Sequence, residues 1–526
     1  MASLRRVNYI FGGDLMGTYL DPGNTGFKSF PAADYTDRSG LIALINDTID
    51  TKQRVTCICR PQGFGKTLSA QMLCAYYDCT CDSDGLFKGL AAASEESYGK
   101  YLNSCHVVYI DMVSLKAATH NYYDVVRFLT KELCSEISAA FSVDGTENDI
   151  SSLMKNVIQK SDRKLILIID EWDAPVRETH LLQKEYIEFL RHLMTGHDGT
   201  PFFSAVYMTG IIPFKRIGSE HALDGLKEYT MTDPGKAADI MCFTENDVKV
   251  LCDKSGTDID EVRDTCAGYL PSDKASYYSP SQVMRKIKNK GADYTFNVSA
   301  LIELINYDID GLIRAVTVLT GGGEVSVDTS RFLNDSDNIR NKNDILLLLV
   351  HFGYLAYDPT TKTARIPNSY IEGIFLRAIR RTPNKEAIRR VMESQKLLDD
   401  ILDMNEEAVA QQIEKIQDEN PGISSYSENA LHNVVKQALF SARSVFDLQD
   451  SSCSEDGRSD IAYIPKPNMP MPAIFIELRD DKEKALDKSY PEEMSSYADN
   501  MIIIAIDRDI TSDKRMRICK INPCDK

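Results

Sequence analysis

The sequence predicts an α/β protein that begins with a parallel β-sheet covered by helices on both faces. Over the first 240 residues, short apolar runs rich in β-branched residues alternate with stretches of helical periodicity. These runs are nearly continuous, which is typical of strands buried on both faces. After residue 240 helical patterns dominate, and a second group of strands follows residue 420. At roughly 150 residues per domain, the 526 residues correspond to about three or four domains.

Composition excludes several classes of protein. With 43% hydrophobic and 26% charged residues, the chain is neither largely disordered nor fibrous. The net charge of −18 argues against a non-specific nucleic-acid coat protein but leaves room for a local basic groove. The 13 cysteines form no paired C-x-x-C units, so we expect reduced thiols, a cytoplasmic location and no structural zinc site. No run approaches ~20 apolar residues and the N-terminus lacks an apolar signal core, so we expect neither a transmembrane helix nor a membrane partner.

The elements of the first part follow from periodicity. We expect strands at residues 55–59, 106–112, 165–170 and 205–210, and helices at residues 67–77, 125–141 and 186–194. The run LILIID at 165–170 is the clearest buried strand of the chain. Strands that alternate with helices in this way predict a parallel sheet.

The rest of the chain divides into two further segments. Residues 344–379 predict the order helix, strand, tight turn, strand, helix, with the turn at Asp358-Pro359-Thr360-Thr361. This order resembles a winged-helix module, and an α+β cap would have the same pattern. Residues 385–420 are charged and helical, and Asn420-Pro421-Gly422 is a turn. We then expect a helix at 429–443 and strands at 460–464, 473–478 and 501–506, which gives domains at 1–240, 241–385 and 386–526.

The strongest local motif is RPQGFGKT, which lies directly after one predicted strand and directly before a helix. A phosphate loop needs converging main-chain N–H groups, a helix N-terminus, a lysine for the terminal phosphates and a hydroxyl for Mg²⁺. Arg60 stands where the consensus has its first glycine. We predict that the nucleotide-binding residues of this loop are Gly63, Phe64, Gly65, Lys66, Thr67 and Leu68.

Two further strand ends supply the remaining groups of a nucleotide site. Asp170 ends the strand in LILIIDEWD, where it would hold Mg²⁺ with Thr67, and Glu171 could polarise the attacking water. Thr209 in AVYMTG would end a neighbouring strand and sense the γ-phosphate; alone, it is more often a buried hydroxyl bonded to backbone. Lys215 and Arg216 follow it, either as contacts to the γ-phosphate, from the same chain or a neighbouring subunit, or as a solvated basic pair.

These motifs, in this order, resemble the AAA-ATPase-like family of prokaryotic proteins. The resemblance covers most of residues 30–380 and rests on RPQGFGKTLSAQMLCAYYD, LILIIDEWDAPVR, YMTGIIPFKR, LKEYTM, CFTENDV, YYSPSQV and LVHFGYLAYD. The family's loop typically reads RPRRFGKT, so Arg60 is a family trait, whereas Gln62 and Gly63 replace a basic pair. The segment 34–47 looks like the family's first segment, which in related ATPases lies near the adenine, so the resemblance makes Arg38 a candidate for nucleotide contact. DTCAGYL at 264–270 departs from the more aromatic WYDGY-like form of the family.

The family commonly carries a C-terminal PD-(D/E)XK nuclease-like domain, and the end of this chain has a matching pattern. GRSDIAYIPK places Asp460 at the start of one strand, and AIFIELR places Glu477 near the end of the next. Both carboxylates could meet at one end of a hairpin and bind Mg²⁺ or Mn²⁺. The carbonyl of Leu478 and the carboxylate of Glu428, on the preceding helix, could complete the site.

One position departs from the nuclease pattern. The third signature residue is normally lysine, and here it is Arg479, which keeps its proton and cannot act as a base. Arg479 could still stabilise negative charge in the transition state, or Lys482 could reach the site. Lys488 occupies the position where the family has a glutamine. A degenerate domain that only binds a partner or nucleic acid is therefore the alternative.

The sequence thus predicts an ATPase that binds ATP and Mg²⁺ and gates a metal-dependent nuclease acting on DNA or RNA. The catalytic residues would be Glu171, Asp460, Glu477 and Arg479. The rival interpretation is a signalling or scaffold ATPase whose nucleotide state sets its assembly, for example as a homo-oligomer, and whose degenerate C-terminal domain only binds a partner or nucleic acid. A basic groove beside Asp460 and Glu477 would favour the nuclease, and an acidic or closed pocket the scaffold.

Overall fold

A computed structural model describes most of the chain. The residues that it describes are 19–119, 124–143, 149–178, 183–196, 198–214, 223, 225–269, 277–288, 296–307, 309, 311–330, 339–419, 428–451, 459–467, 469–479, 496–497, 500–507 and 517–523. The chain forms two compact units. Unit 1 comprises residues 1–295, 328–339 and 346–360, and unit 2 comprises residues 296–327, 340–345 and 361–526.

Unit 1 is built on a five-stranded sheet in which every neighbouring pair of strands is parallel. Its strands are β1 (Val55–Cys59), β2 (His106–Asp111), β3 (Leu165–Asp170), β4 (Ala205–Gly210) and β5 (Leu226–Tyr229). The order across the sheet is β2-β3-β4-β1-β5. Because all five strands run in the same direction, their carboxyl ends lie at one edge.

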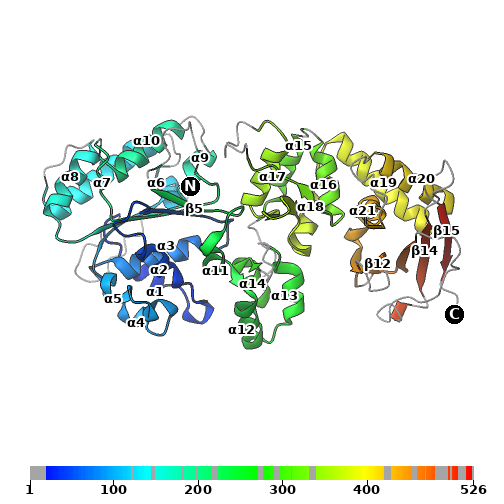
Figure 1. Ribbon diagram of the computed structural model, residues 1–526, viewed down its shortest axis with the longest axis horizontal. Coiled ribbons are helices and arrows are strands. Elements are labelled where there is room, and N and C mark those ends of the chain that lie inside the picture. The colour runs from blue at the N-terminus through cyan, green and yellow to red at the C-terminus, as the bar shows by residue number, and fades with distance from the viewer. Residues whose placement is uncertain are drawn as a thin grey trace, which may run out of the picture. The chain divides into compact units, whose positions relative to one another are not determined.

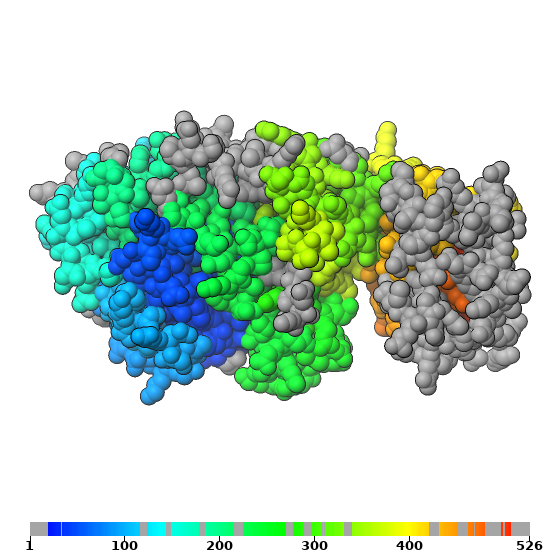
Figure 2. Space-filling view, viewed as in Figure 1, coloured from blue at the N-terminus to red at the C-terminus, as the bar shows by residue number. Residues whose placement is uncertain are grey.

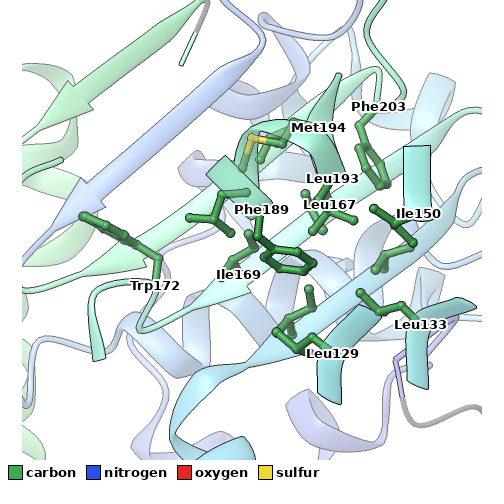
Figure 3. Packing of buried hydrophobic residues seen from close by; sticks show 14 of the residues in the cluster. Leu129, Leu133, Ile150, Leu167, Ile169, Trp172, Phe189, Leu193, Met194 and Phe203 are labelled. Atoms are coloured by element: carbon green, nitrogen blue, oxygen red, sulfur yellow. The ribbon is translucent and has the colours of Figure 1, made fainter. Parts of the chain in front are cut away.

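Helices cover both faces of this sheet (Figure 1). One face carries α6 (Met112–Thr119), α7 (Val125–Phe141), α8 (Ile150–Lys160), α9 (Ala174–Glu178) and α10 (Gln183–Met194). The other carries α1 (Thr25–Lys28), α2 (Gly40–Asn46), α3 (Lys66–Tyr77), α4 (Asp84–Phe87) and α5 (Tyr98–Tyr101), with 3₁₀ turns at Ala32–Asp34 and Ala91–Ser94. Figure 3 shows the packing on the first face, where Leu129 and Leu133 of α7 and Phe189 of α10 meet Leu167 and Ile169 of β3. This two-sided burial explains the continuous apolar runs of the strands.

Small helices follow the sheet in unit 1. They are a 3₁₀ turn (Gly235–Ala237), α11 (Ala238–Met241), α12 (Glu245–Ser255), α13 (Ile259–Cys266) and α14 (Pro280–Ile287), with the short pair β6 (Phe243–Thr244) and β7 (Tyr277–Tyr278). A capping box fixes the start of α12, since Thr244 and Asp247 satisfy each other's backbone N–H groups.

The next elements occur in the predicted order of helix, strand, turn, strand and helix. They are α17 (Lys342–His351), β9 (Ala356–Asp358), β10 (Thr363–Arg365) and α18 (Ser369–Arg381). Before them lie α15 (Val298–Asn306), α16 (Leu312–Thr320) and β8 (Val325–Ser326), and β8 pairs antiparallel with β10 within unit 2.

Unit 2 ends in a mixed sheet with helices packed against it. The helices are α19 (Lys385–Leu402), α20 (Glu406–Asp418) and α21 (Glu428–Ala438), and the strands are β11 (Phe446–Ser451), β12 (Ser459–Pro465), β13 (Ala473–Arg479), β14 (Met501–Asp507) and β15 (Arg517–Pro523). The strands lie in sequence order, and only the pair β13–β14 is parallel. Apolar residues of the three helices and of the strands form one core.

The structure corrects the sequence prediction in a few places. The helix expected at 429–443 ends at Ala438, and a 3₁₀ turn occupies Phe440–Ser444. Strands β5, β11 and β15 were not expected, because LKEY, FDLQDS and RICKINP each interrupt an apolar run with charged or polar residues. Within the described ranges, no helix combines the length and apolarity needed to cross a membrane.

Candidate functional site

A loop at the carboxyl edge of the parallel sheet has the geometry of an anion cradle. Residues 60–67 connect β1 to α3, and Gly63 and Gly65 have φ values of 83° and 80°, which glycine adopts at little cost. No side chain caps the N-terminus of α3, so its first N–H groups remain available to a ligand. The backbone N–H of Ser281 donates to the Gly63 carbonyl at 3.1 Å and fixes the loop from outside.

Lys66 lies at the centre of this loop and is almost fully buried, with 4% of its side chain exposed. Its Nζ donates to the carbonyl oxygens of Arg60 at 3.0 Å and Pro61 at 3.1 Å. Nζ also forms an ion pair with Glu171 Oε1 at 2.9 Å. The lysine that the sequence predicted for the terminal phosphates is therefore next to the predicted water-activating carboxylate.

Arg60 has a different role from the glycine of the consensus loop. Its side chain is fully buried, and its Nη1 donates to the carbonyl oxygens of Cys59 at 2.8 Å and Tyr229 at 3.2 Å. The guanidinium therefore ties the ends of β1 and β5 together. The Arg60 side chain therefore points away from the phosphate-binding side of the loop and stabilises the strands beneath it.

Asp170 and Thr209 meet at the ends of two adjacent strands. Thr209 Oγ1 donates to Asp170 Oδ1 at 2.5 Å and accepts a hydrogen bond from the Glu171 N–H at 3.0 Å. Burial raises the pKa of Asp170, and hydrogen bonds from Thr209 and Thr67 partly offset this effect. The carboxylate of Asp170 and the hydroxyl of Thr67 are hard oxygen donors, so they fit Mg²⁺.

Glu171 is held between two cations. Its φ of 53° is unusual for a residue other than glycine, and it aims the side chain at the loop. Besides Lys66, it accepts from Arg177 Nη2 at 2.7 Å. Burial alone would raise the pKa of Glu171, but the positive charges of Lys66 and Arg177 lower it below its ordinary value. The side chain of Glu171 is thus ionised.

Asp173 and Arg177 extend this network. Arg177 Nε lies 3.0 Å from Asp173 Oδ2, which also accepts from the N–H groups of Ile211 at 3.1 Å and Ile212 at 2.9 Å. Asp173 is buried, and burial raises its pKa despite the charge of Arg177. A Cβ at Gly210 would come within 2.9 Å of Asp173 Oδ1 and closer still to Trp172, so this strand end requires glycine. Sequence analysis had missed Arg177; its i+4 spacing from Asp173 was the available signal.

A cavity of about 300 Å³ opens beside the loop. Segments far apart in sequence line it, and they lie side by side as blue and green surface in Figure 2. The lining is mainly apolar and includes Tyr35, Phe64, Leu68, Met72, Met241 and Phe243. Arg38 stands at this cavity, where its guanidinium pairs with Asp247 at 2.7 Å and lies 5.0 Å from the centre of the Phe243 ring.

The carboxylates predicted in unit 2 lie on paired strands. Asp460 of β12 is directly opposite Glu477 of β13 in an antiparallel register. Glu477 is buried at 8% exposure. Glu428 begins α21, and Arg479 ends β13 opposite Asp507 of β14. The side chains of Asp460, Glu428 and Arg479 lie outside the described part of the structure, as do residues Lys215, Arg216, Lys482 and Lys488 entirely.

Comparison with known proteins identifies one domain. Residues 31–218 match the model of a family described as predicted AAA-ATPase. No curated protein matches the chain. Among solved structures, the ORC2 protein of Aeropyrum pernix in ADPNP–ADP complexes is similar at a TM-score of 0.30 and 11% identity, covering 65% of this chain and 93% of that one. Its ADP form gives a TM-score of 0.29 and 12% identity, covering 68% and 98%. The family match supports an AAA-ATPase-like domain with a nucleotide site; likeness at these TM-scores adds no argument.

Proposed function

We propose that unit 1 is an ATPase that binds ATP with Mg²⁺ and hydrolyses it. One observation carries the proposal: Lys66 of the glycine loop and Glu171 of the adjacent strand end lie 2.9 Å apart, beside the hydroxyl–carboxylate pair of Thr209 and Asp170. In the proposed site, a phosphate-binding cation, a candidate base and hard oxygen ligands lie together at one edge of the sheet. The match of residues 31–218 to predicted AAA-ATPases supports the same conclusion.

The residues of the site have separable roles. The N–H groups at residues 63–67 bind the phosphates, and Lys66 exchanges its carbonyl partners for the terminal phosphate oxygens. Thr67 and Asp170 hold Mg²⁺, which when bound neutralises developing charge on the phosphates. As Lys66 turns to the phosphates, Glu171 is released from one ion pair and accepts a proton from the attacking water. Thr209 couples the two strand ends, since it contacts both Asp170 and the Glu171 backbone.

The apolar cavity beside the loop is suited to the nucleotide base. Its volume of about 300 Å³ and its aromatic and thioether lining fit a flat heterocycle, which would stack against Tyr35. Arg38 is already paired with Asp247, so we assign it to shaping the cavity wall.

Glu171→Gln tests the hydrolysis step. This variant keeps the shape of the side chain and removes the base, so turnover of Mg·ATP should fall by ~10²–10⁴-fold while ATP still binds. Glu185→Gln is the matched control, because Glu185 is exposed on α10. Equal rates of phosphate release from the Glu171→Gln variant and the unmodified protein would exclude the role of Glu171.

A second function is proposed for unit 2: a metal-dependent nuclease that the ATPase regulates. The direct register of Asp460 with Glu477 favours it, together with a helix, three antiparallel strands and a parallel fourth strand in that order. The alternative is a domain that only binds a partner or nucleic acid, in keeping with arginine at position 479. Incubation with plasmid, single-stranded DNA and RNA, with Mg²⁺ or Mn²⁺ and with or without ATP, separates these two proposals. Cleavage that depends on both metal and ATP supports the regulated nuclease.

A further inference from the structure

Three side chains of different chemistry meet at the edge of the parallel sheet opposite the nucleotide site. They are Asp21, which precedes α1, Cys79, which follows α3, and His106, which begins β2. Their donor atoms all lie within 4.8 Å of one another. His106 Nδ1 is 2.8 Å from Asp21 Oδ2 and 3.5 Å from Cys79 Sγ. One ring nitrogen therefore faces both a carboxylate and a thiol.

The backbone fixes the three segments in this arrangement. The N–H of Asp21 donates to the Val107 carbonyl at 2.7 Å, and the N–H of Val107 returns a bond to Asp21 Oδ1 at 2.8 Å. The N–H of Cys79 donates to the Cys105 carbonyl at 2.9 Å. The His106 ring packs edge-on against Phe141, with ring centroids 5.0 Å apart. One carboxylate oxygen is thus anchored by backbone, and the other is directed at His106.

These donors suit a transition-metal ion of intermediate softness. An imidazole, a thiolate and a carboxylate are common zinc ligands, and three protein ligands with a fourth open position are typical of zinc sites that keep a bound water. The side chains of His106 and Asp21 are 20% and 12% exposed, so solvent can reach that position. The same His106 Nδ1 lies within reach of both other donors, at 2.8 Å from Asp21 Oδ2 and 3.5 Å from Cys79 Sγ.

We propose that Asp21, Cys79 and His106 bind one Zn²⁺ ion per chain, with water as the fourth ligand. The ion replaces the Nδ1 proton and the thiol proton, so binding releases protons and strengthens as pH rises. The bound ion cross-links three segments of unit 1 that are far apart in sequence. The lack of paired C-x-x-C units argues only against a zinc site whose ligands are close in sequence. Here the fold brings together ligands from three separate segments.

This site is separate from the ATP site. In the register of β2 with β3, His106 is opposite Leu165 and Asp111 is opposite Asp170. Five residue steps along β2 therefore separate His106 from the edge that carries Asp170, which is about 17 Å at ~3.3 Å per residue. The all-oxygen ligands at the ATP site prefer Mg²⁺, so the two sites select different ions.

Cobalt substitution of the full-length chain tests the proposal. After treatment with a chelator, one equivalent of Co²⁺ should give a thiolate-to-metal charge-transfer absorption, and one equivalent of Zn²⁺ should remove it. Cys79→Ser should abolish the absorption and weaken Zn²⁺ binding at least ~100-fold, because it removes the only thiolate of the set. Cys81→Ser is the matched control, since Cys81 is half-buried two residues away and bonds to the backbone of Ala75 and Asp78.

Thermal unfolding separates loss of the metal from loss of the fold. With chelator present, the unmodified chain, Cys79→Ser and Cys81→Ser should melt at similar temperatures. Zn²⁺ should raise the melting temperature of the unmodified chain and Cys81→Ser only. The proposal is overturned if the chain binds no stoichiometric Zn²⁺. It is also overturned if Cys79→Ser retains that ion, which would place the metal elsewhere, such as at the buried cluster of Cys57, Cys59 and Glu228.

Discussion

Polar side chains lie on neighbouring strands in both units of the chain, but the two sheets bring them together differently. In unit 1, Asp170 and Thr209 end adjacent parallel strands, so any polar residues at the carboxyl ends of such strands become neighbours. In unit 2, Asp460 and Glu477 lie opposite one another because β12 and β13 run antiparallel in one register. A parallel sheet gathers a site from distant segments, whereas an antiparallel pair builds one from a single hairpin.

The two units also differ in which charged groups surround their carboxylates. Glu171 has two cationic partners at 2.9 and 2.7 Å, and Arg177 links it to Asp173. This network compensates the buried charge and holds Glu171, the proposed base, next to the glycine loop. In unit 2, the buried Glu477 is opposite Asp460 in the strand register, and two neighbouring carboxylates are tolerated best when a cation lies between them.

The largest expected effect belongs to unit 2. Replacing both Asp460 and Glu477 by alanine should eliminate any metal-dependent cleavage, because no carboxylate of the pair remains to hold the ion. ATP turnover should be largely retained, since the ATPase residues lie on another sheet. Gel assays of nucleic-acid cleavage and phosphate release, performed on the same preparations, measure both. Parallel loss of the two activities would break the distinction between the units.

Arg479→Lys sharpens the same comparison. The variant restores the residue that the nuclease pattern expects, so cleavage with Mg²⁺ or Mn²⁺ should appear or increase. Cleavage by the unmodified chain, measured under the same conditions, is the reference. If a correctly folded Arg479→Lys chain is inactive on plasmid, single-stranded DNA and RNA, unit 2 is better described as a binding domain.

Arg177→Ala should destabilise unit 1 by about 3 kcal/mol, because it leaves Asp173 buried without its cation. Trp172 is the chain's single tryptophan, so its fluorescence during denaturant unfolding follows this unit. Adding Asp173→Asn to the variant should recover much of the loss, since an amide oxygen can still accept from Ile211 and Ile212. Simple additivity of the two single losses would show that the pair does not act together.

Acid should weaken unit 1 through His351. Burial, and then the charge of Arg60, lowers the pKa of His351 from 6.5 to about 3. The unfolded chain therefore binds more protons between these values, so stability falls as pH drops below 6.5, by about 2 kcal/mol at pH 5 from this residue. His351→Gln should flatten this part of the curve measured by Trp172 fluorescence and leave the slope above pH 7 unchanged. Identical acid slopes would contradict the assignment.

Much of unit 1 could be predicted from sequence, because its signals are local. The runs VTCIC and LILIID read as buried strands, and the glycine loop lies between a strand and a helix, as the structure confirms. The contact between Asp170 and Thr209 was expected because both residues were assigned to the ends of neighbouring strands, and the observed strand order makes β3 and β4 adjacent. In unit 2, strands were expected at 473–478 and 501–506 for the same reason, and the structure has them at Ala473–Arg479 and Met501–Asp507.

The remainder depends on contacts that no local pattern encodes. Arg177 reaches Glu171 because Glu171 adopts a left-handed backbone conformation. Nothing in the sequence predicted that conformation. Arg60 looked like a departure from a consensus, yet its side chain bridges the ends of β1 and β5. Asp21, Cys79 and His106 come from three segments whose proximity requires the complete sheet.

Calorimetric titration of ATP in the presence of Mg²⁺ tests the central claim most directly. The unmodified chain should bind one ATP per chain, and Lys66→Ala should bind it about 100-fold more weakly, since a charged hydrogen bond to phosphate contributes roughly 2–3 kcal/mol. Lys249→Ala, which alters an exposed lysine of α12, should bind like the unmodified chain. Equal ATP affinity of the unmodified chain and Lys66→Ala would contradict the assignment of this loop as the phosphate site.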